Sequence, residues 1–267
     1  TVVDLWGGIA RPADGTPWQR DTVSIVFSCT KGAVALCAHV LASRGKLDVD
    51  APVASYWPEF ARKGKEYATV RMMLDHSVGV PAFKTLLRPG GCTDWDYMVE
   101  MLADEEPFWF PGTRNGYHMI NFGWTVGELV RRVSGRSLGA FFRDEIAGPL
   151  GIEFWIGTPE EVEPRVAPMM MHAPKPGDPI GEFMMKIMTD PRSTQALSLL
   201  NTGGFDPNSR ACHAAEIGGG GGISNARGLA GMYAPLACGG ELGGVRLVDR
   251  VQLARMGEVS VATNEDA

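Results

Sequence analysis

The chain has 267 residues, of which 45% are hydrophobic and 21% are charged, and this composition is usual for a globular protein with a sizeable core. Its formal net charge of −6 argues against binding to a nucleic-acid backbone, which requires a basic surface. No run reaches the roughly 18 consecutive apolar residues of a membrane span, so we expect no membrane partner.

The five cysteines form no C-x-x-C pair and are odd in number. This usage favours free thiols in a reducing compartment over a disulfide framework or a zinc site. The N-terminal residues TVVDLWGG contain neither the basic segment nor the cleavage site of a signal peptide. We therefore expect a cytoplasmic protein, and the missing initial Met suggests that the sequence begins inside a longer product.

Residues 2–9 and 22–27 are rich in β-forming side chains and predict two strands, separated by a turn at Asp14-Gly15. A helix should then run from about Ser28 to Ser43 and end at Gly45. Between residues 32 and 42 only His39 is clearly polar. A helix that is apolar on every side is a buried one.

The rest of the chain reads mainly as helix and loop. Prolines divide residues 46–112 into short segments, and amphipathic helices are predicted at 122–135 and 137–152. A further helix within 223–240 begins at a capping Ser224 or Asn225, and a short strand or turn followed by a helix is predicted at 240–256. Residues 158–215 show no clear period.

These elements predict an α+β fold, in which a helical region is inserted between β-forming segments at the two ends of the chain. We expect one domain over 1–267, incomplete at both ends, with the first strands in 1–30, a mainly helical region in 31–215 and a return toward the sheet in 216–267. Two strands cannot form a stable sheet by themselves. Further strands lie either in the poorly patterned segments or beyond the end of the sequence, and we expect the latter.

Ser28 and Lys31 lie one helical turn apart at the start of the buried helix, where side chains three positions apart share a face. A lysine whose pKa is lowered by burial can take the proton of a serine hydroxyl, and we expect free N–H groups in the first turn to stabilise an oxyanion. The alternative is an N-cap serine beside a lysine that extends to solvent. Ser43 and Lys46 have the same spacing, but they lie at the helix end, where the dipole has the wrong sign.

Three longer stretches of the sequence resemble one known family. These stretches are FSCTKG with RGKLDVDAPVASYWPEF, TVRMMLDHSVGV, and FPGTRNGYHMINFGWTVGELVRRVSGRSLGAFFRDEIAGPLGI. The family is the β-lactamase-like serine hydrolases, which include class C β-lactamases, D,D-carboxypeptidases and family VIII carboxylesterases. In order and spacing, the resemblance covers most of residues 2–255, and the chain is most similar to the esterase or "β-lactamase-related" branch.

The resemblance implies an antiparallel sheet flanked by helices. It assigns Ser28 as the acylating nucleophile, Lys31 as its base and Tyr117 as the tyrosine of the second motif, which relays protons to the leaving group. From the residues alone, Tyr117 is equally a surface or packing aromatic beside a turn. No cofactor or metal is implied.

Two departures from the family pattern bear on function. The second motif usually reads Tyr-x-Asn, whereas Met119 stands in the asparagine position, so we do not expect efficient β-lactam turnover. The third motif, which the family carries on a late strand, is absent, and we expect the C-terminal strands to be missing from this sequence.

Several other residues are weaker candidates. His118 either tunes Tyr117 or contacts substrate, and Trp124 either lines a pocket or belongs to the core. His76 is expected to be a structural histidine at a helix end rather than a general base. The glycine run 218–222 lacks the ending of a phosphate-binding loop, and we expect a mobile loop near the cleft. Methionines near 170 and 185 form either an adaptable apolar rim or a loosely packed loop.

The sequence thus predicts a serine hydrolase that cleaves carboxylic esters of small molecules through an acyl-enzyme. The sequence leaves open four alternative functions. Three use the same three residues: a β-lactamase, a D,D-peptidase or amidase, and a transacylase. The fourth is a catalytically silent scaffold of the same fold.

Overall fold

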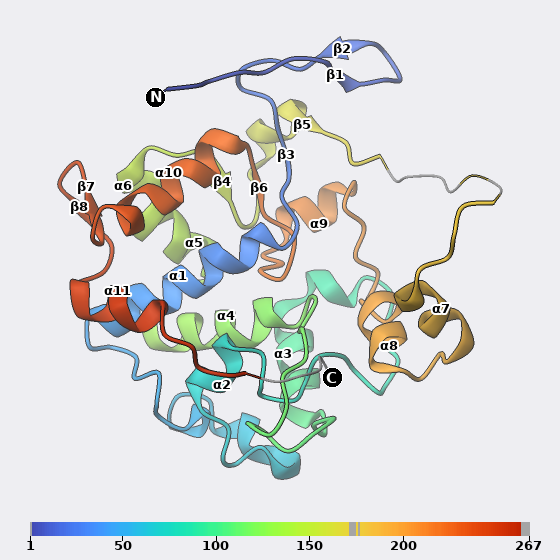
Figure 1. Cartoon of the computed structure of the whole chain (residues 1–267), viewed down its shortest axis with the longest axis vertical. Coiled ribbons are helices and arrows are strands. Elements are labelled where there is room, and N and C mark those ends of the chain that lie inside the picture. Colours follow the sequence, from blue (N-terminus) through green and yellow to red (C-terminus); the bar gives the residue numbers. More distant parts are fainter. Residues whose placement is uncertain (1, 171–174, 176, 263–267) are drawn as a thin grey trace.

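The computed structural model describes residues 2–170, 175 and 177–262. Helix α1 (Cys29–Ser43) lies between a small sheet and a group of helices (Figure 1). Its buried side chains, among them Val34, Cys37 and Val40, point in several directions around the helix axis. The predicted burial of this helix is confirmed, because both halves of the fold pack against it.

The central sheet has the strand order β4 (Phe154–Trp155), β6 (Ile223–Ser224), β3 (Val23–Ile25) and β5 (Val166–Ala167). β6 pairs antiparallel with both β3 and β4, as predicted, whereas β5 runs parallel to β3. Ser24 faces Ser224 across the ladder, so the two ends of the chain meet in this sheet. The α+β class is confirmed, and part of the missing β structure lies in segments that show no strand pattern.

The predicted strand at 2–9 is wrong for residues 2–7. Pairing begins at β1 (Ile9–Arg11), which forms a hairpin with β2 (Thr16–Pro17) that projects beyond the sheet (Figure 1). Val2, Val3 and Leu5 are exposed. Within the described chain they pack against no core that would stabilise them as a paired strand.

The helical half contains α2 (Val70–Leu74), α3 (Trp95–Asp104) and α4 (Phe122–Ser134). Short 3₁₀ segments connect them: η1 (Val53–Ser55), η2 (Pro58–Gly64) and η3 (Gly91–Thr93). α4 packs against α1, α2 and α3, and it ends at Gly135 in the left-handed conformation. The amphipathic helix predicted at 122–135 is therefore confirmed, with its apolar face toward the core.

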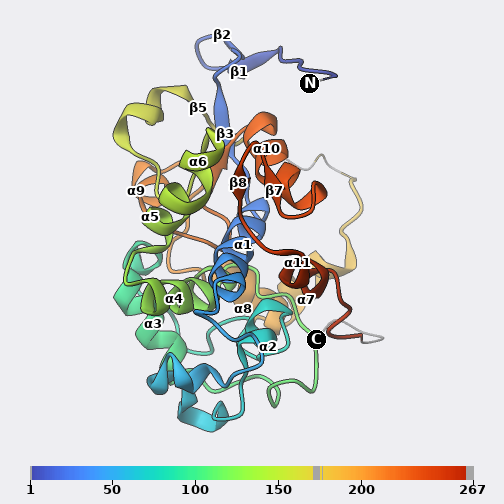
Figure 2. The ribbon, with the colours of Figure 1, turned by 90° about the vertical axis from the view of Figure 1, so that its left-hand side faces the viewer.

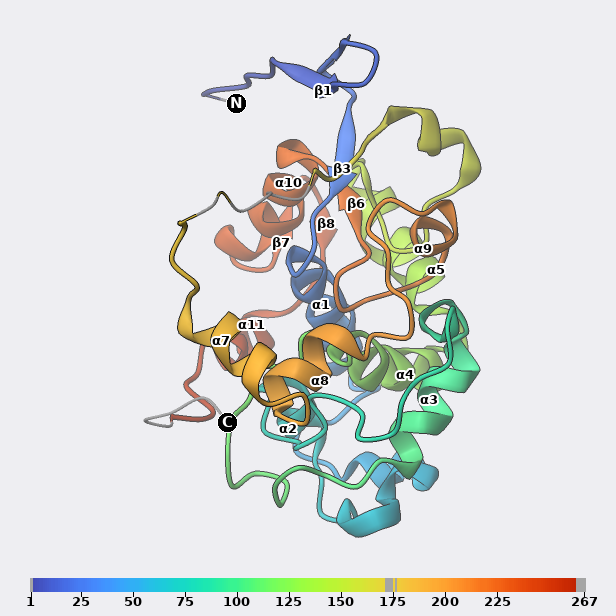
Figure 3. The same ribbon diagram turned by 90° about the vertical axis from the view of Figure 1, so that its right-hand side faces the viewer.

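The helices predicted at 137–152 and 223–240 are also confirmed. The first is α5 (Leu138–Phe142), continued by a π-helical turn η4 (Arg143–Ala147) and α6 (Gly148–Leu150). The second is α10 (Ala226–Ala237), whose N-cap Asn225 accepts a hydrogen bond from the Gly228 N–H. α10 lies on one side of β3, and α5 and α6 lie on the other (Figures 2 and 3).

Beyond α10 the hairpin β7 (Glu241–Leu242) and β8 (Val245–Arg246) precedes α11 (Arg250–Met256), as the sequence predicts. The unpatterned stretch contains η5 (Glu160–Arg165), β5, α7 (Glu182–Thr189), α8 (Thr194–Leu200) and α9 (Arg210–Ala214). These elements are too short to show a period in the sequence. Among the described residues, no helix combines the length and hydropathy needed to cross a membrane.

Candidate active site

A strained turn connects β3 to α1. Phe27 has a φ of 42°, in the left-handed region that residues other than glycine rarely adopt. The Thr30 hydroxyl donates to the Phe27 carbonyl at 2.5 Å and accepts from the Gly222 N–H at 2.9 Å. Two segments far apart in sequence thus fix the backbone directly before Ser28.

Ser28 occupies the N-cap position of α1, but its side chain makes no capping hydrogen bond. Its φ and ψ are −67° and −7°, whereas a capping serine has an extended backbone. The residue is exposed. The alternative interpretation as a simple N-cap serine is therefore wrong, and the hydroxyl is accessible at the surface.

Lys31 does not extend to solvent. Its side chain is buried, with 8% of the residue exposed, and its Nζ lies 3.1 Å from Ser28 Oγ. The same Nζ lies 2.6 Å from the carbonyl oxygens of Met119 and Gly219. Three chain segments hold the amine against the serine.

Burial lowers the pKa of Lys31 from 10.5 to about 7, because desolvation disfavours the ammonium. No carboxylate of the described residues forms an ion pair with it. A neutral amine has two N–H donors and one lone pair. In the neutral form, two N–H donors directed at the two carbonyls would leave the lone pair for the Ser28 hydroxyl.

The glycine run 218–222 packs closely against this site rather than forming a loose loop. A Cβ on Gly219 would lie 2.1 Å from the Ile120 carbonyl oxygen, and one on Gly222 would lie 2.5 Å from Thr30 Oγ1. Only glycine allows the backbone to approach so closely. The run lies beside the cleft, as predicted, but its residues are buried.

The expectation of free N–H groups around the serine is wrong. The N–H groups of Cys29, Thr30 and Lys31 donate to the carbonyls of Val26, Phe27 and Ser28 at 3.1, 2.9 and 3.0 Å. A tight turn before α1 satisfies them. Within the described chain, the Ser28 N–H itself has no hydrogen-bond partner.

Tyr117 lies on the other side of Lys31, whose Nζ is 4.7 Å from the centre of the tyrosine ring. The residue is 41% exposed. Its position therefore differs from that of a core aromatic, and it borders both the amine and solvent.

Two histidines form a layer behind Tyr117. The ring of His76 lies 5.0 Å from the Tyr117 ring, and its Nδ1 accepts the backbone N–H of His118 at 3.1 Å. Burial is the main reason that the pKa of His76 falls to about 4 and that of His118 to about 3. Both rings are neutral at pH 7. His118 has no ring nitrogen left for substrate, because Nε2 accepts from the Val80 N–H and Nδ1 faces the Gly116 carbonyl.

A cavity of about 280 Å³ opens beside Ser28. Met119 and the glycines of the run form one wall, and α8 with the loop after it forms the other. The apolar side chains that line it are Phe27, Met119, Ile120, Leu199, Phe205 and Pro207. No sequence pattern indicated the second wall, which comes from the unpatterned stretch.

Trp124 is not brought to Ser28. It is buried in α4 and lines a separate cavity with Cys92 and Trp95. Of the methionines, Met184, Met185 and Met188 are exposed on α7, which packs against α8. Met170 is exposed as well, and Met171 lies outside the described residues.

Comparison with known proteins identifies the family of the chain. The beta-lactamase family model matches residues 1–266. The esterase/beta-lactamase LipL of Mycobacterium tuberculosis is 35% identical over 258 residues, which cover 93% of this chain and 58% of LipL. A family VIII carboxylesterase of known structure is 38% identical with a TM-score of 0.83, over 96% of this chain and 66% of that one.

A penicillin-binding protein homologue from Caulobacter crescentus is 31% identical with a TM-score of 0.84, again over 96% of this chain and 66% of that one. The chain thus spans about three-fifths to two-thirds of the length of these relatives. The match over nearly the whole of the sequence places this chain in the beta-lactamase family of hydrolases, on its esterase-like branch.

Proposed function

We propose that the protein cleaves carboxylic esters of small molecules through an acyl-enzyme on Ser28, with Lys31 as the base and Tyr117 as the acid. One observation carries the proposal: Lys31 Nζ is buried 3.1 Å from Ser28 Oγ and 2.6 Å from two backbone carbonyl oxygens, with which a neutral amine can share its two N–H groups. The similarity to an esterase/beta-lactamase and to a family VIII carboxylesterase supports the same reaction class.

In the first step, the Ser28 proton moves to Lys31 Nζ while Oγ forms a bond to the ester carbonyl carbon. The tetrahedral intermediate collapses, its bond to the alkoxide oxygen breaks, and the proton passes from Lys31 by way of Tyr117 to that oxygen. Water then attacks the acyl-enzyme, gives its proton to Lys31, and the acid leaves as Ser28 regains its hydrogen.

The oxyanion of the intermediate needs N–H donors. The Ser28 N–H is suited to this task because, in the described chain, it is not used elsewhere. The three following N–H groups are already engaged within the turn and contribute only through the helix dipole.

The second motif supports esters over β-lactams, because Met119 offers no side-chain amide there. A transacylase would use the same intermediate with another acceptor.

Intact-mass analysis of the full-length protein after treatment with a fluorophosphonate tests the nucleophile. We expect one adduct in the wild type and in Ser43→Ala, and none in Ser28→Ala. A wild type that hydrolyses p-nitrophenyl esters without taking up the label contradicts the assignment. Nitrocefin turnover on the same sample, if it matches ester turnover, would favour the β-lactamase alternative.

A further inference from the structure

We infer that His76 is the positioning residue for Tyr117: its ring and its backbone carbonyl hold the tyrosine beside Lys31 Nζ, where the phenol can pass a proton to the leaving group. This inference rests on the proposed function and adds one residue to its machinery. In this role His76 takes no proton itself.

Tyr117 depends on its neighbours for its position. It lies in the connection 105–121 between α3 and α4, which contains no helix or strand. Within the described residues it forms no hydrogen bond through its backbone or its hydroxyl, and it is 41% exposed. A side chain in such a place samples several rotamers unless the groups around it restrict it.

His76 contacts the chain on both sides of Tyr117. Its carbonyl accepts the Gly116 N–H at 3.2 Å, and its Nδ1 accepts the His118 N–H at 3.1 Å. Its ring lies 5.0 Å from the Tyr117 ring, at an interplanar angle of 48°. A single residue thus fixes both neighbours of the tyrosine and packs against its ring, while Lys31 Nζ lies 4.7 Å from the centre of that ring.

The segment that carries this histidine is attached to the same connection at the positions before and after it. Asn115 Nδ2 donates to the Asp75 carbonyl at 2.5 Å, and the Gly112 N–H donates to the Ser77 carbonyl at 2.9 Å. Phe122, at the start of α4, packs against the histidine ring with the ring centres 5.0 Å apart. The histidine is therefore held firmly enough to hold another residue.

The backbone of His76 also indicates a use for its side chain. Its φ is 66°, directly after the C-cap of α2, where glycine is the usual residue. Among the described residues other than glycine, only Phe27 and Lys63 also have a positive φ. Phe27 precedes Ser28, so two of these three positions lie beside the proposed machinery. Strain of this kind persists where the surrounding structure requires that residue.

The hydrogen bond to His118 fixes the state of the ring. Because Nδ1 accepts an N–H, the neutral ring carries its proton on Nε2. Burial holds the pKa of His76 at about 4, so the ring is neutral at pH 7. A neutral ring does not compete with Lys31 for the Ser28 proton and places no charge beside the amine.

A double-mutant cycle of His76→Gly and Tyr117→Phe in the full-length protein tests the inference. Glycine keeps the left-handed backbone and removes the ring. We expect His76→Gly to lower kcat/KM about 30-fold for ethyl acetate and less than about threefold for p-nitrophenyl acetate, whose phenolate leaves without a proton. In the Tyr117→Phe background the same change should cost less than about twofold with either ester, because the tyrosine through which it acts has lost its hydroxyl.

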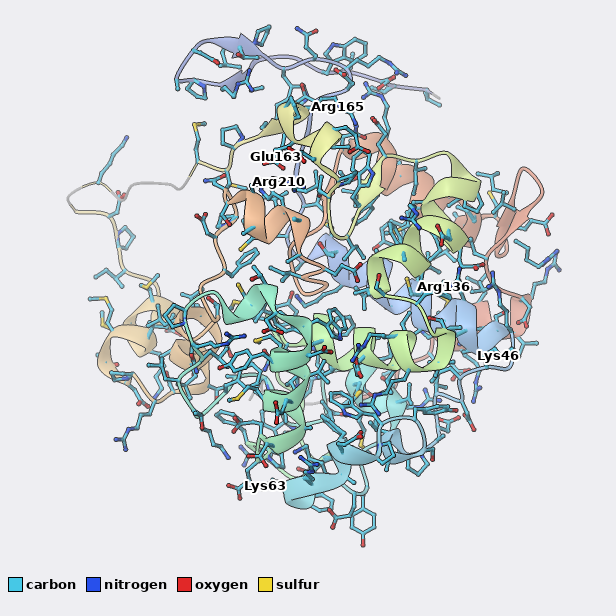
Figure 4. The ribbon with its side chains drawn as sticks, turned by 180° about the vertical axis from the view of Figure 1, so that it is seen from behind. Lys46, Lys63, Arg136, Glu163, Arg165 and Arg210 are labelled. Carbon is cyan, nitrogen blue, oxygen red and sulfur yellow. The ribbon has the colours of Figure 1, made fainter. Side chains whose placement is uncertain are left out.

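Two further variants sharpen the cycle. His76→Asn tolerates the left-handed backbone and places Oδ1 where Nδ1 accepts the His118 N–H, so it should recover kcat/KM for ethyl acetate to within about fivefold of the wild type. Lys63→Gly is the matched control. Lys63 has a φ of 59°, its side chain is 52% exposed, and it lies at the edge of the molecule (Figure 4), so both esters should be cleaved at wild-type rates.

Equal losses with both esters in His76→Gly, an undiminished loss in the Tyr117→Phe background, or wild-type activity toward ethyl acetate would overturn the inference. Should His76→Gly lose the circular dichroism of the wild type, His76→Asn decides: a loss above about tenfold with both esters overturns the inference, and a smaller loss confined to ethyl acetate supports it.

Fluorophosphonate labelling separates this outcome from the fate of the proposed function. Fluoride leaves without a proton, so Ser28 should be labelled in His76→Gly as in the wild type. If the cycle fails while Ser28 is still labelled, the proposed function stands without a positioning role for His76. A wild type that turns over esters without labelling overturns the proposed function itself.

Discussion

The two ends of helix α1 carry the same spacing of serine and lysine in very different surroundings. At the start, Lys31 is buried and its Nζ contacts Ser28 Oγ. At the end, Gly45 has a φ of 66° and breaks the helix, so Ser43 and Lys46 no longer face each other as neighbours on one helix turn. Lys46 is exposed and lies at the edge of the molecule (Figure 4).

Ser43 has a structural task instead. Its Oγ accepts the N–H of Asp249, at 2.8 Å, and thereby attaches the N-cap of α11 to α1. The comparison teaches that the spacing contributes only proximity. Reactivity requires the buried amine, its two carbonyl acceptors and an uncapped hydroxyl, all of which come from tertiary structure.

The largest expected effect is the loss of the nucleophile. Ser28→Ala should lower kcat/KM for an ester by about 10⁴-fold or more, because no other described hydroxyl contacts Lys31 Nζ. Ser43→Ala should change kcat/KM less than twofold and lower the free energy of unfolding by about 1 kcal/mol, since it removes one hydrogen bond. Similar losses of activity in both variants would remove the distinction between the two ends.

Replacing the amine comes next. Lys31→Met keeps the length and the apolar stem, and it should lower kcat/KM by about 10²–10⁴-fold through loss of the general base. Lys46→Met serves as the control and should retain wild-type activity. Steady-state kinetics at pH 8 with circular dichroism of both variants checks the prediction, and a Lys31→Met enzyme with more than a tenth of wild-type activity speaks against it.

Tyr117→Phe should have an effect that depends on the leaving group. An alkyl alkoxide needs protonation as it departs, so we expect about a 100-fold loss with an ethyl ester. p-Nitrophenolate leaves readily without a proton, and the loss there should stay below about tenfold. Tyr67→Phe, an exposed tyrosine, is the control. Equal losses with both esters would assign Tyr117 a positioning role only.

A further prediction concerns stability. The pKa of Lys31 is about 7 in the folded state and 10.5 in the unfolded state, so unfolding takes up a proton between these values. The free energy of unfolding of the wild type relative to Lys31→Met should therefore rise with pH across this window, by at most about 1.4 kcal/mol per unit. Denaturant titrations of both proteins from pH 6 to 10 measure it, and a difference that stays constant argues for a lysine that keeps its proton.

Much of the helical fold can be predicted from the sequence, because α1, α4 and α10 have a clear apolar pattern and clear ends. Of the central sheet, only β3 can be predicted, because β4, β5 and β6 each have two residues and show no alternation. Residues 2–7 show the opposite error, since their β-forming side chains face no core in the described structure.

The candidate site also has parts that can be predicted from the sequence and parts that cannot. Ser28 and Lys31 can be found from spacing and burial, and Tyr117 only through the family resemblance. The Met119 and Gly219 carbonyls are backbone groups without a sequence signature, although the five successive glycines at 218–222 indicate a close approach. The wall from Leu199 to Pro207 depends on buried polar anchors such as Asn201, which look like ordinary loop residues in the sequence.

The most direct test of the central claim is the rate at which a fluorophosphonate modifies Ser28 as a function of pH, followed by intact mass. If Lys31 acts as an unprotonated amine, the rate constant rises tenfold per pH unit at low pH and levels off above a midpoint near 7. A rate constant that continues to rise without a plateau to pH 9, or the same midpoint in Lys31→Met, would contradict the account.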